Sequence, residues 1–122
     1  MATSYNIVVD QRATYADTIT YTDSNGDPVD LTGYEARIMV KRSHDVADVD
    51  AVVDIDSDAG GTGNTSGIAL NSSGEIAFVI SDTETTALEP GNYVWDLKLT
   101  EPSGRSKRLV EGSVTVTPGV TA

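Results

Sequence analysis

Alternating aspartates near the middle of the chain are the residues whose spacing most resembles a metal site. The acidic stretch 45–58 contains Asp45, Asp48, Asp50, Asp54, Asp56 and Asp58. Its last three carboxylates, Asp54, Asp56 and Asp58, are spaced as in calcium loops, and calcium takes six or more oxygen ligands. The helix–loop–helix pattern is incomplete, because its twelfth position is Thr65 instead of Glu. We expect no metal or cofactor. Calcium at these three aspartates is the minor alternative to an exposed edge whose charges block strand pairing.

The other constellations predict no active site. His44 is the only histidine and lies between Ser43 and Asp45, but neighbours along an extended chain point apart. A Ser-His-Asp triad also needs an oxyanion hole, and the chain has no Gly-x-Ser-x-Gly elbow. The glycine-rich run at 60–63 lacks the following Lys and helix of a phosphate loop. The sequence therefore predicts a protein that is not an enzyme.

Strand and turn signals alternate along the whole chain. Apolar residues recur at every second position in short stretches at 4–9, 17–22, 34–42, 75–80, 92–100 and 105–117, and short apolar runs lie at 50–56 and 67–70. Clusters of Gly, Asn, Asp and Pro separate these stretches. About seven or eight short strands at this spacing are typical of an antiparallel β-sandwich. We expect a single domain over 1–122, with Trp95 and Phe78 in its core.

One short helix is expected near 81–88. Ser81 is an N-cap residue type, and Glu84 three positions later completes a capping box. Pro90 and Gly91 then end the segment, so only one or two turns fit.

The charge of the chain restricts its partners. The formal charge is -11, from 19 acidic and 8 basic residues. Nucleic acids and anionic membrane surfaces attract the opposite sign, so neither is expected as a partner. On one sheet, Arg37, Lys98 and Lys107 are predicted to face outward and to form cross-strand pairs with carboxylates at Glu35, Asp96 and Glu111.

Several motifs together resemble one family. They are GDPVDL at 26–31, GEIAFVI at 74–80, PGNYVWD at 90–96 and LVEGSVTV at 109–116. In this order they resemble the small immunoglobulin-like β-sandwich proteins of tailed bacteriophages, including the N-terminal domains of baseplate upper proteins. The resemblance implies a non-catalytic structural component located in the virion. Its partners would be other virion proteins in many copies, and it could also form a homo-oligomer.

The place of docking stays open at this point. Attachment to the tail, baseplate or neck is the first expectation, and capsid decoration is the second. A carbohydrate-binding module is the alternative from another class, since β-sandwiches also present sugar-binding faces. Sugars need exposed aromatic residues, whereas strand parity directs Tyr21, Tyr34, Tyr93 and Trp95 inward and leaves only Tyr15 free.

Two regions are predicted to make intersubunit contacts. The apolar residues of the terminal segments, Ile7 and Val9 with Val114 and Val116, could pair as edge strands, to which another chain can add. The acidic residues Asp45, Asp48 and Asp50 belong to the segment 43–67, which lacks a clear core pattern and would suit a basic partner surface.

Overall fold

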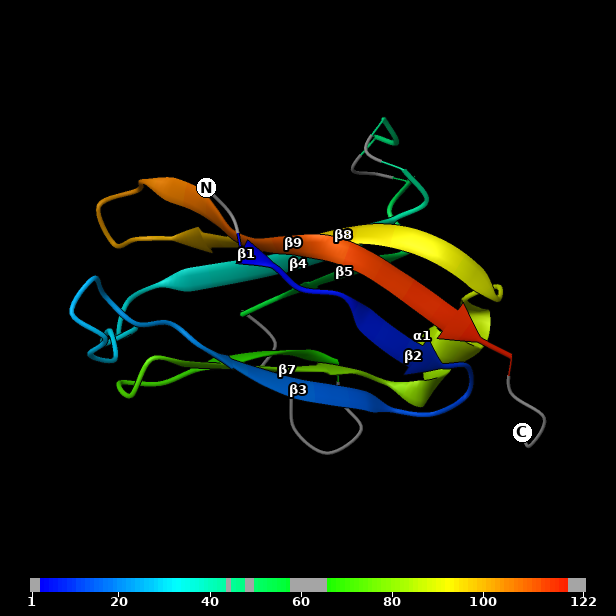
Figure 1. The fold of residues 1–122 in the computed structure, drawn as a ribbon, viewed down its shortest axis with the longest axis horizontal. Coiled ribbons are helices and arrows are strands. Elements are labelled where there is room, and N and C mark those ends of the chain that lie inside the picture. The colour runs from blue at the N-terminus through cyan, green and yellow to red at the C-terminus, as the bar shows by residue number, and fades with distance from the viewer. Residues whose placement is uncertain (1–2, 44, 48–49, 58–65, 119–122) are drawn as a thin grey trace.

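The computed structural model describes residues 3–43, 45–47, 50–57 and 66–118, which form two β-sheets packed face to face (Figure 1). The strands are β1 (Thr3–Ser4), β2 (Ile7–Asp10), β3 (Tyr15–Thr20), β4 (Glu35–Lys41), β5 (Val53–Asp56), β6 (Gly67–Leu70), β7 (Glu75–Ile80), β8 (Gly91–Thr100) and β9 (Ser106–Thr117). One helix, α1 (Asp82–Ala87), lies at one end of the layers. The predicted all-β sandwich with one short helix is confirmed.

The strand order is that of an immunoglobulin-like domain. The large sheet runs β1-β9-β8-β4-β5, with β2 also paired to β9, and the small sheet runs β3-β7-β6. In the letters used for immunoglobulin domains, β3, β7 and β6 are strands B, E and D, while β4, β8 and β9 are C, F and G. Alternating apolar side chains from both sheets meet in one core. This leaves the outer face of the large sheet to polar residues.

The N-terminal strands depart from a purely antiparallel sandwich. β2 runs parallel to β9, with Ile7 opposite Val114 and Val9 opposite Val116. Parallel neighbours need a long connection, and here nearly the whole domain lies between the two strands. The predicted strand at 4–9 is broken at Tyr5 and Asn6, which separate β1 from β2.

Tyr93 and Trp95 fix the start of β8. The Tyr93 hydroxyl donates a 2.7 Å hydrogen bond to the carbonyl oxygen of Glu89, as in the tyrosine corner of immunoglobulin domains. Trp95, two residues later, takes the position at which antibody domains have the second cysteine of their inter-sheet disulfide. Its ring lies 5.9 Å from that of Phe78 on the opposite sheet. Both side chains are buried, as predicted. This aromatic contact therefore joins the sheets through strands E and F, whereas the disulfide of antibody domains joins B and F.

The helix begins where the capping box predicts. The Ser81 hydroxyl accepts a hydrogen bond from the backbone N–H of Glu84, and Leu88 ends the helix in an extended conformation. Its Thr85 side chain donates to the carbonyl oxygen of Ala13, so the helix closes the end of the sandwich against the turn after β2. None of the helices in the described part of the chain could cross a membrane.

Candidate functional site

The outer face of the large sheet carries two adjacent rows of charged side chains. Strand pairing places Arg37 on β4 opposite Lys98 on β8, and Lys98 opposite Arg108 on β9. We call these three residues the basic row. The acidic row lies next to it along the strands and consists of Asp54 on β5, Asp96 on β8 and Glu111 on β9. Met39 on β4 lies between Asp54 and Asp96. Together the two rows are called the striped face.

A β-bulge in β9 brings Arg108 into the basic row. Leu97 pairs with Val110 but the next residue, Lys98, pairs with Arg108, so Leu109 is an extra residue. Because side chains alternate along a strand, the extra residue returns Arg108 to the outer face.

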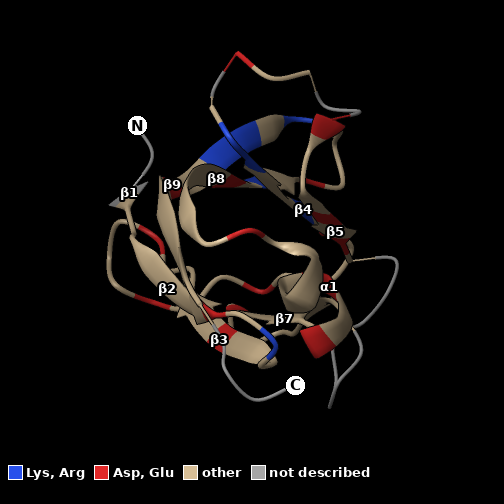
Figure 2. Cartoon of the chain, turned by 90° about the vertical axis from the view of Figure 1, so that its right-hand side faces the viewer, with Lys and Arg blue, Asp and Glu red and all other residues tan. Residues whose placement is uncertain are grey.

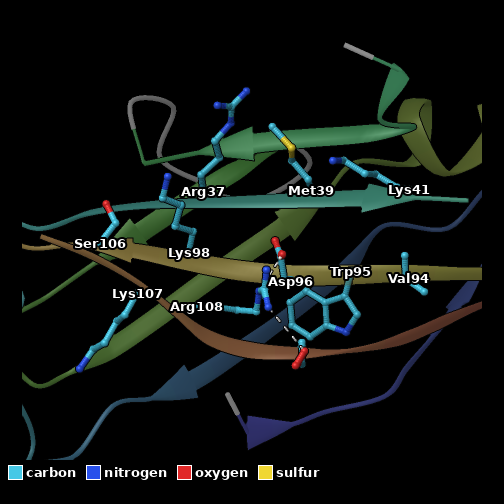
Figure 3. A pocket seen from close by; sticks show the side chains of 11 residues that line it. Arg37, Met39, Lys41, Val94, Trp95, Asp96, Lys98, Ser106, Lys107 and Arg108 are labelled. Carbon is cyan, nitrogen blue, oxygen red and sulfur yellow. Dashed lines mark hydrogen bonds and ion pairs between the residues drawn. The ribbon is translucent and has the colours of Figure 1, made fainter. Parts of the chain in front are cut away.

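The same bulge turns Lys107 away from this face. Lys107 is opposite the buried Leu99, and its ammonium group lies 4.5 Å from the centroid of the Tyr21 ring and contacts the Tyr21 hydroxyl. Figure 3 shows its side chain directed away from Arg37 and Lys98. The prediction that Lys107 faces outward with Arg37 and Lys98 is therefore wrong, and Arg108 takes that role.

Ion pairs connect the two rows at their ends. Arg37 makes a two-pronged contact with Asp54, with nitrogen–oxygen distances of 2.9 and 2.7 Å. Arg108 lies 3.2 Å from Asp96 and 3.9 Å from Glu111. These groups are about half exposed, so each pair contributes only about 0.2–1 kcal/mol to stability. Asp96 and Glu111 pair with Arg108 instead of the predicted Lys98 and Lys107, and the carboxylate that Arg37 contacts is Asp54 instead of Glu35.

Lys98 is the exception in the centre of the row. It is exposed, and it has no ion-pair partner among the residues that the structure describes. Arg37 and Arg108 flank it on the neighbouring strands, and like charges directly opposite each other destabilise a sheet. Asp56, opposite Arg37, ends the row at the sheet edge. A partner that supplies a carboxylate to Lys98 would relieve this repulsion.

The two rows border a shallow hollow of about 490 Å³ (Figure 3). Its lining includes Arg37, Met39, Lys98 and Arg108, so charged groups surround a small apolar centre. Figure 2 shows most of the Lys and Arg on the large sheet and the loop beside it, whereas Asp and Glu are spread over the described chain, this sheet included. This shape and charge suit contact with another surface.

The structure places the apolar interface candidates in the core. Ile7, Val9, Val114 and Val116 are at most 3% exposed. The two terminal segments pair with each other, so that β9 is an inner strand and, of these two strands, β2 is the one at the edge of the sheet. These four side chains are therefore unavailable to a partner. Val8, between two of them, faces outward and is 59% exposed.

The acidic candidates do not form a metal site in the described part of the chain. Asp54 and Asp56 share the outer face of β5, and Asp54 is bound to Arg37. Asp45 and Asp50 are exposed in the connection between β4 and β5. Asp48, Asp58 and His44 lie outside the described residues. No group of three or more His, Cys, Asp or Glu among the described residues could hold a metal ion.

The aromatic side chains offer little surface for a sugar. Among the aromatic residues that the structure describes, Tyr5 is the most exposed, at 37%, and the others are buried or partly buried. Tyr15, predicted to be free, packs against Phe78 and donates to Asp17, and burial followed by the charge of Asp17 raises the pKa of Tyr15. The Tyr5 hydroxyl donates to the same carboxylate at 2.6 Å, and this hydrogen bond is the main cause of its raised pKa.

Comparisons with known proteins give only distant structural likenesses. No family model matches the chain, and no curated protein matches it. Similar solved structures include murine CRIg, with 11% identity over 94% of this chain and 92% of that chain, and a TM-score of 0.45. The extracellular domain of the voltage-gated sodium channel beta4 subunit also has 11% identity and a TM-score of 0.45, over 98% of this chain and 96% of that chain. At these values the likenesses carry nothing about activity or partners.

Proposed function

We propose that this protein is a non-catalytic structural component of a tailed-bacteriophage virion that docks on the tail, baseplate or neck through its striped face. One observation carries the docking role: Lys98 lies exposed between two other cations, without a carboxylate of its own among the described residues. Such a group gains most when another protein surface covers it. The assignment to a virion is supported by the sequence motifs that resemble tailed-phage proteins.

Particle composition tests this proposal. Purified particles should contain the protein in many copies, and antibody labelling in negative stain should place it on the tail or baseplate. Label on the capsid would support the decoration role instead. Particles without the protein would refute both locations.

A matched pair of variants tests the docking surface. Lys98→Glu and Arg105→Glu each replace an exposed cation with a carboxylate, but Arg105 lies in the turn between β8 and β9, outside the striped face and outside the lining of the hollow. We expect Lys98→Glu to lower occupancy in particles and Arg105→Glu to leave it near the wild-type value. Equal occupancy of the two variants would refute docking through this face.

A further inference from the structure

We infer that the striped face binds a second copy of this chain, related to the first by a two-fold axis that lies between the two rows. The inference rests on the proposed function and deepens it, because it takes the same docking surface and names its partner: in a particle that holds many copies, the chain that covers Lys98 is a neighbouring copy of this protein. It rests on the order of charges across β4, β8 and β9 and on the charge of the whole chain.

The two rows are complementary to each other when one copy is turned over. They lie parallel, two residues apart along the strands, which is roughly 6.8 Å. A two-fold axis parallel to the rows and midway between them places each strand over the same strand of the second copy and exchanges the two rows. On β8, Lys98 then faces Asp96 of the second copy, and on β9, Arg108 faces Glu111. On β4, Arg37 faces Met39, and on the edge strand β5, Asp56 faces Asp54, so the attractive contacts are those of β8 and β9. The symmetry makes each contact twice, as in any isologous interface.

Net charge favours this face over the other surfaces. Two copies that each carry a formal charge of -11 repel each other, and the repulsion must be lowest where they touch. The basic row and the acidic row have the same number of formal charges with opposite sign. The excess of acidic residues therefore lies outside the two rows, where contact between copies would bring like charges together.

Lys98 and Asp96 are the residues on which the pairing depends. Within one copy, Arg37 and Arg108 already have carboxylate partners, so they gain less from a second chain. Lys98 has none among the described residues, and Asp96 of the second copy would supply it. Met39, between the acidic residues, gives the contact an apolar centre.

The size of the face predicts a weak dimer. The face is four strands wide, at ~4.8 Å per strand, and about as long as the seven residues of β4, at ~3.4 Å per residue. Its flat area is therefore roughly 450 Å². A stable complex usually buries about 800 Å² per partner, so we expect a dissociation constant in roughly the micromolar to millimolar range. Exposed charges dominate the contact, and added salt should therefore weaken it.

Charge-swap variants of the full chain test the inference. The dissociation constant of the dimer is measured by sedimentation velocity over a range of protein concentrations, at ~0.05 M and at ~0.5 M salt. Wild type should dimerise at low salt and dissociate at high salt. Lys98→Glu alone and Asp96→Lys alone place like charges together across the axis, and each should raise the dissociation constant by about tenfold or more. An equimolar mixture of the two variants should form heterodimers, because both contacts are then attractive. Arg105→Glu, in the turn between β8 and β9 and outside the lining of the hollow, is the control and should dimerise like wild type.

The double variant, Lys98→Glu with Asp96→Lys, keeps both signs and should dimerise with itself. If circular dichroism shows that Asp96→Lys alone is unfolded, the double variant replaces the mixture as the test of restored dimerisation. The inference is overturned if wild type stays monomeric at low salt, if Lys98→Glu dimerises like wild type, or if neither the mixture nor the double variant restores the dimer. These measurements need no particles. If wild type does not dimerise in solution but is incorporated normally into particles, only the inference of a second copy is refuted. If wild type dimerises but is absent from particles, only the proposed function is refuted.

Discussion

The indole nitrogen of Trp95 donates a 2.8 Å hydrogen bond to the backbone carbonyl oxygen of Tyr5. This carbonyl lies at the break between β1 and β2 and directly above Gly112, where any Cβ would overlap it. The Asn6 side chain accepts a hydrogen bond from the backbone N–H of Ser113 beside it. The largest side chain of the core therefore also holds the N-terminal edge of the sheet in place.

Removing the Trp95 ring should destabilise the domain strongly. Trp95→Ala leaves a large cavity between the sheets, and we expect the free energy of unfolding to fall by ~3–5 kcal/mol in urea denaturation. Trp95→Phe keeps an aromatic ring but removes the N–H, so the Tyr5 carbonyl loses its donor and the expected cost is ~1–3 kcal/mol. A loss below about 0.5 kcal/mol for Trp95→Ala would contradict the position of the ring in the core.

Gly112 is expected to tolerate no side chain. Gly112→Ala should displace Tyr5 and Asn6, weaken the pairing of β1 with β9 and lower the free energy of unfolding by about 1–3 kcal/mol. Ser113→Ala is the control, because the backbone N–H that contacts Asn6 remains and the change should stay within about 0.5 kcal/mol. Thermal unfolding followed by circular dichroism measures both, and equal stability of the two variants would argue against the close approach.

The Tyr93 hydroxyl should contribute to stability out of proportion to its size. Tyr93→Phe removes the donor to the Glu89 carbonyl in a part-buried position, and we expect a loss of ~1–2 kcal/mol in urea denaturation. Tyr34→Phe is a suitable comparison, since the Tyr34 hydroxyl forms no hydrogen bond among the residues that the structure describes, and the expected change is within about 0.5 kcal/mol. A neutral Tyr93→Phe would mean that the corner is held by the ring alone.

Stability should decline at alkaline pH because of Tyr15. Its pKa is raised above the ordinary value of 10.0, chiefly by burial, so the folded protein keeps a proton that the unfolded chain loses. This contribution is fully present below about pH 10 and is lost as the pH rises further, by at most about 1.4 kcal/mol per pH unit. Tyr15→Phe cannot ionise, so its free energy of unfolding should fall less between pH 9 and 12 than that of wild type, on the ordinary scale of tyrosine titration. Parallel pH profiles for the two proteins would contradict this prediction.

Much of the fold follows from local sequence patterns. Strict alternation at 92–100 predicted β8, and the Ser81–Glu84 capping box predicted α1, because both signals depend on residues close together in the chain. The break at Tyr5 and Asn6 depends on Trp95 and Gly112, which are far away in the sequence. The hydrogen bond from the Trp95 indole to the Tyr5 carbonyl spans 90 positions of the chain. A pattern within one segment contains no sign of such a contact.

The candidate site was predicted less well for a similar reason. Alternation assigned Lys107 to the outer face, but the bulge at Leu109 shifts the register of β9 and brings Arg108 there. The bulge follows from pairing with β8, which is a tertiary property. Likewise, Ile7 and Val114 were recognised as apolar strand residues, but their mutual parallel pairing, which buries them, was not foreseen.

The reactivity of Lys98 toward an acylating reagent tests the docking surface most directly. The reagent is applied to the free protein at low concentration and to purified particles, and the modified lysines are quantified by mass spectrometry. Lys107 is the internal comparison, since it is also exposed and lines the edge of the same hollow, but its ammonium group turns toward Tyr21. The proposal predicts that Lys98 is strongly protected in particles relative to the free protein, and more strongly than Lys107. Equal modification of Lys98 in the two states would contradict the striped face as the docking surface.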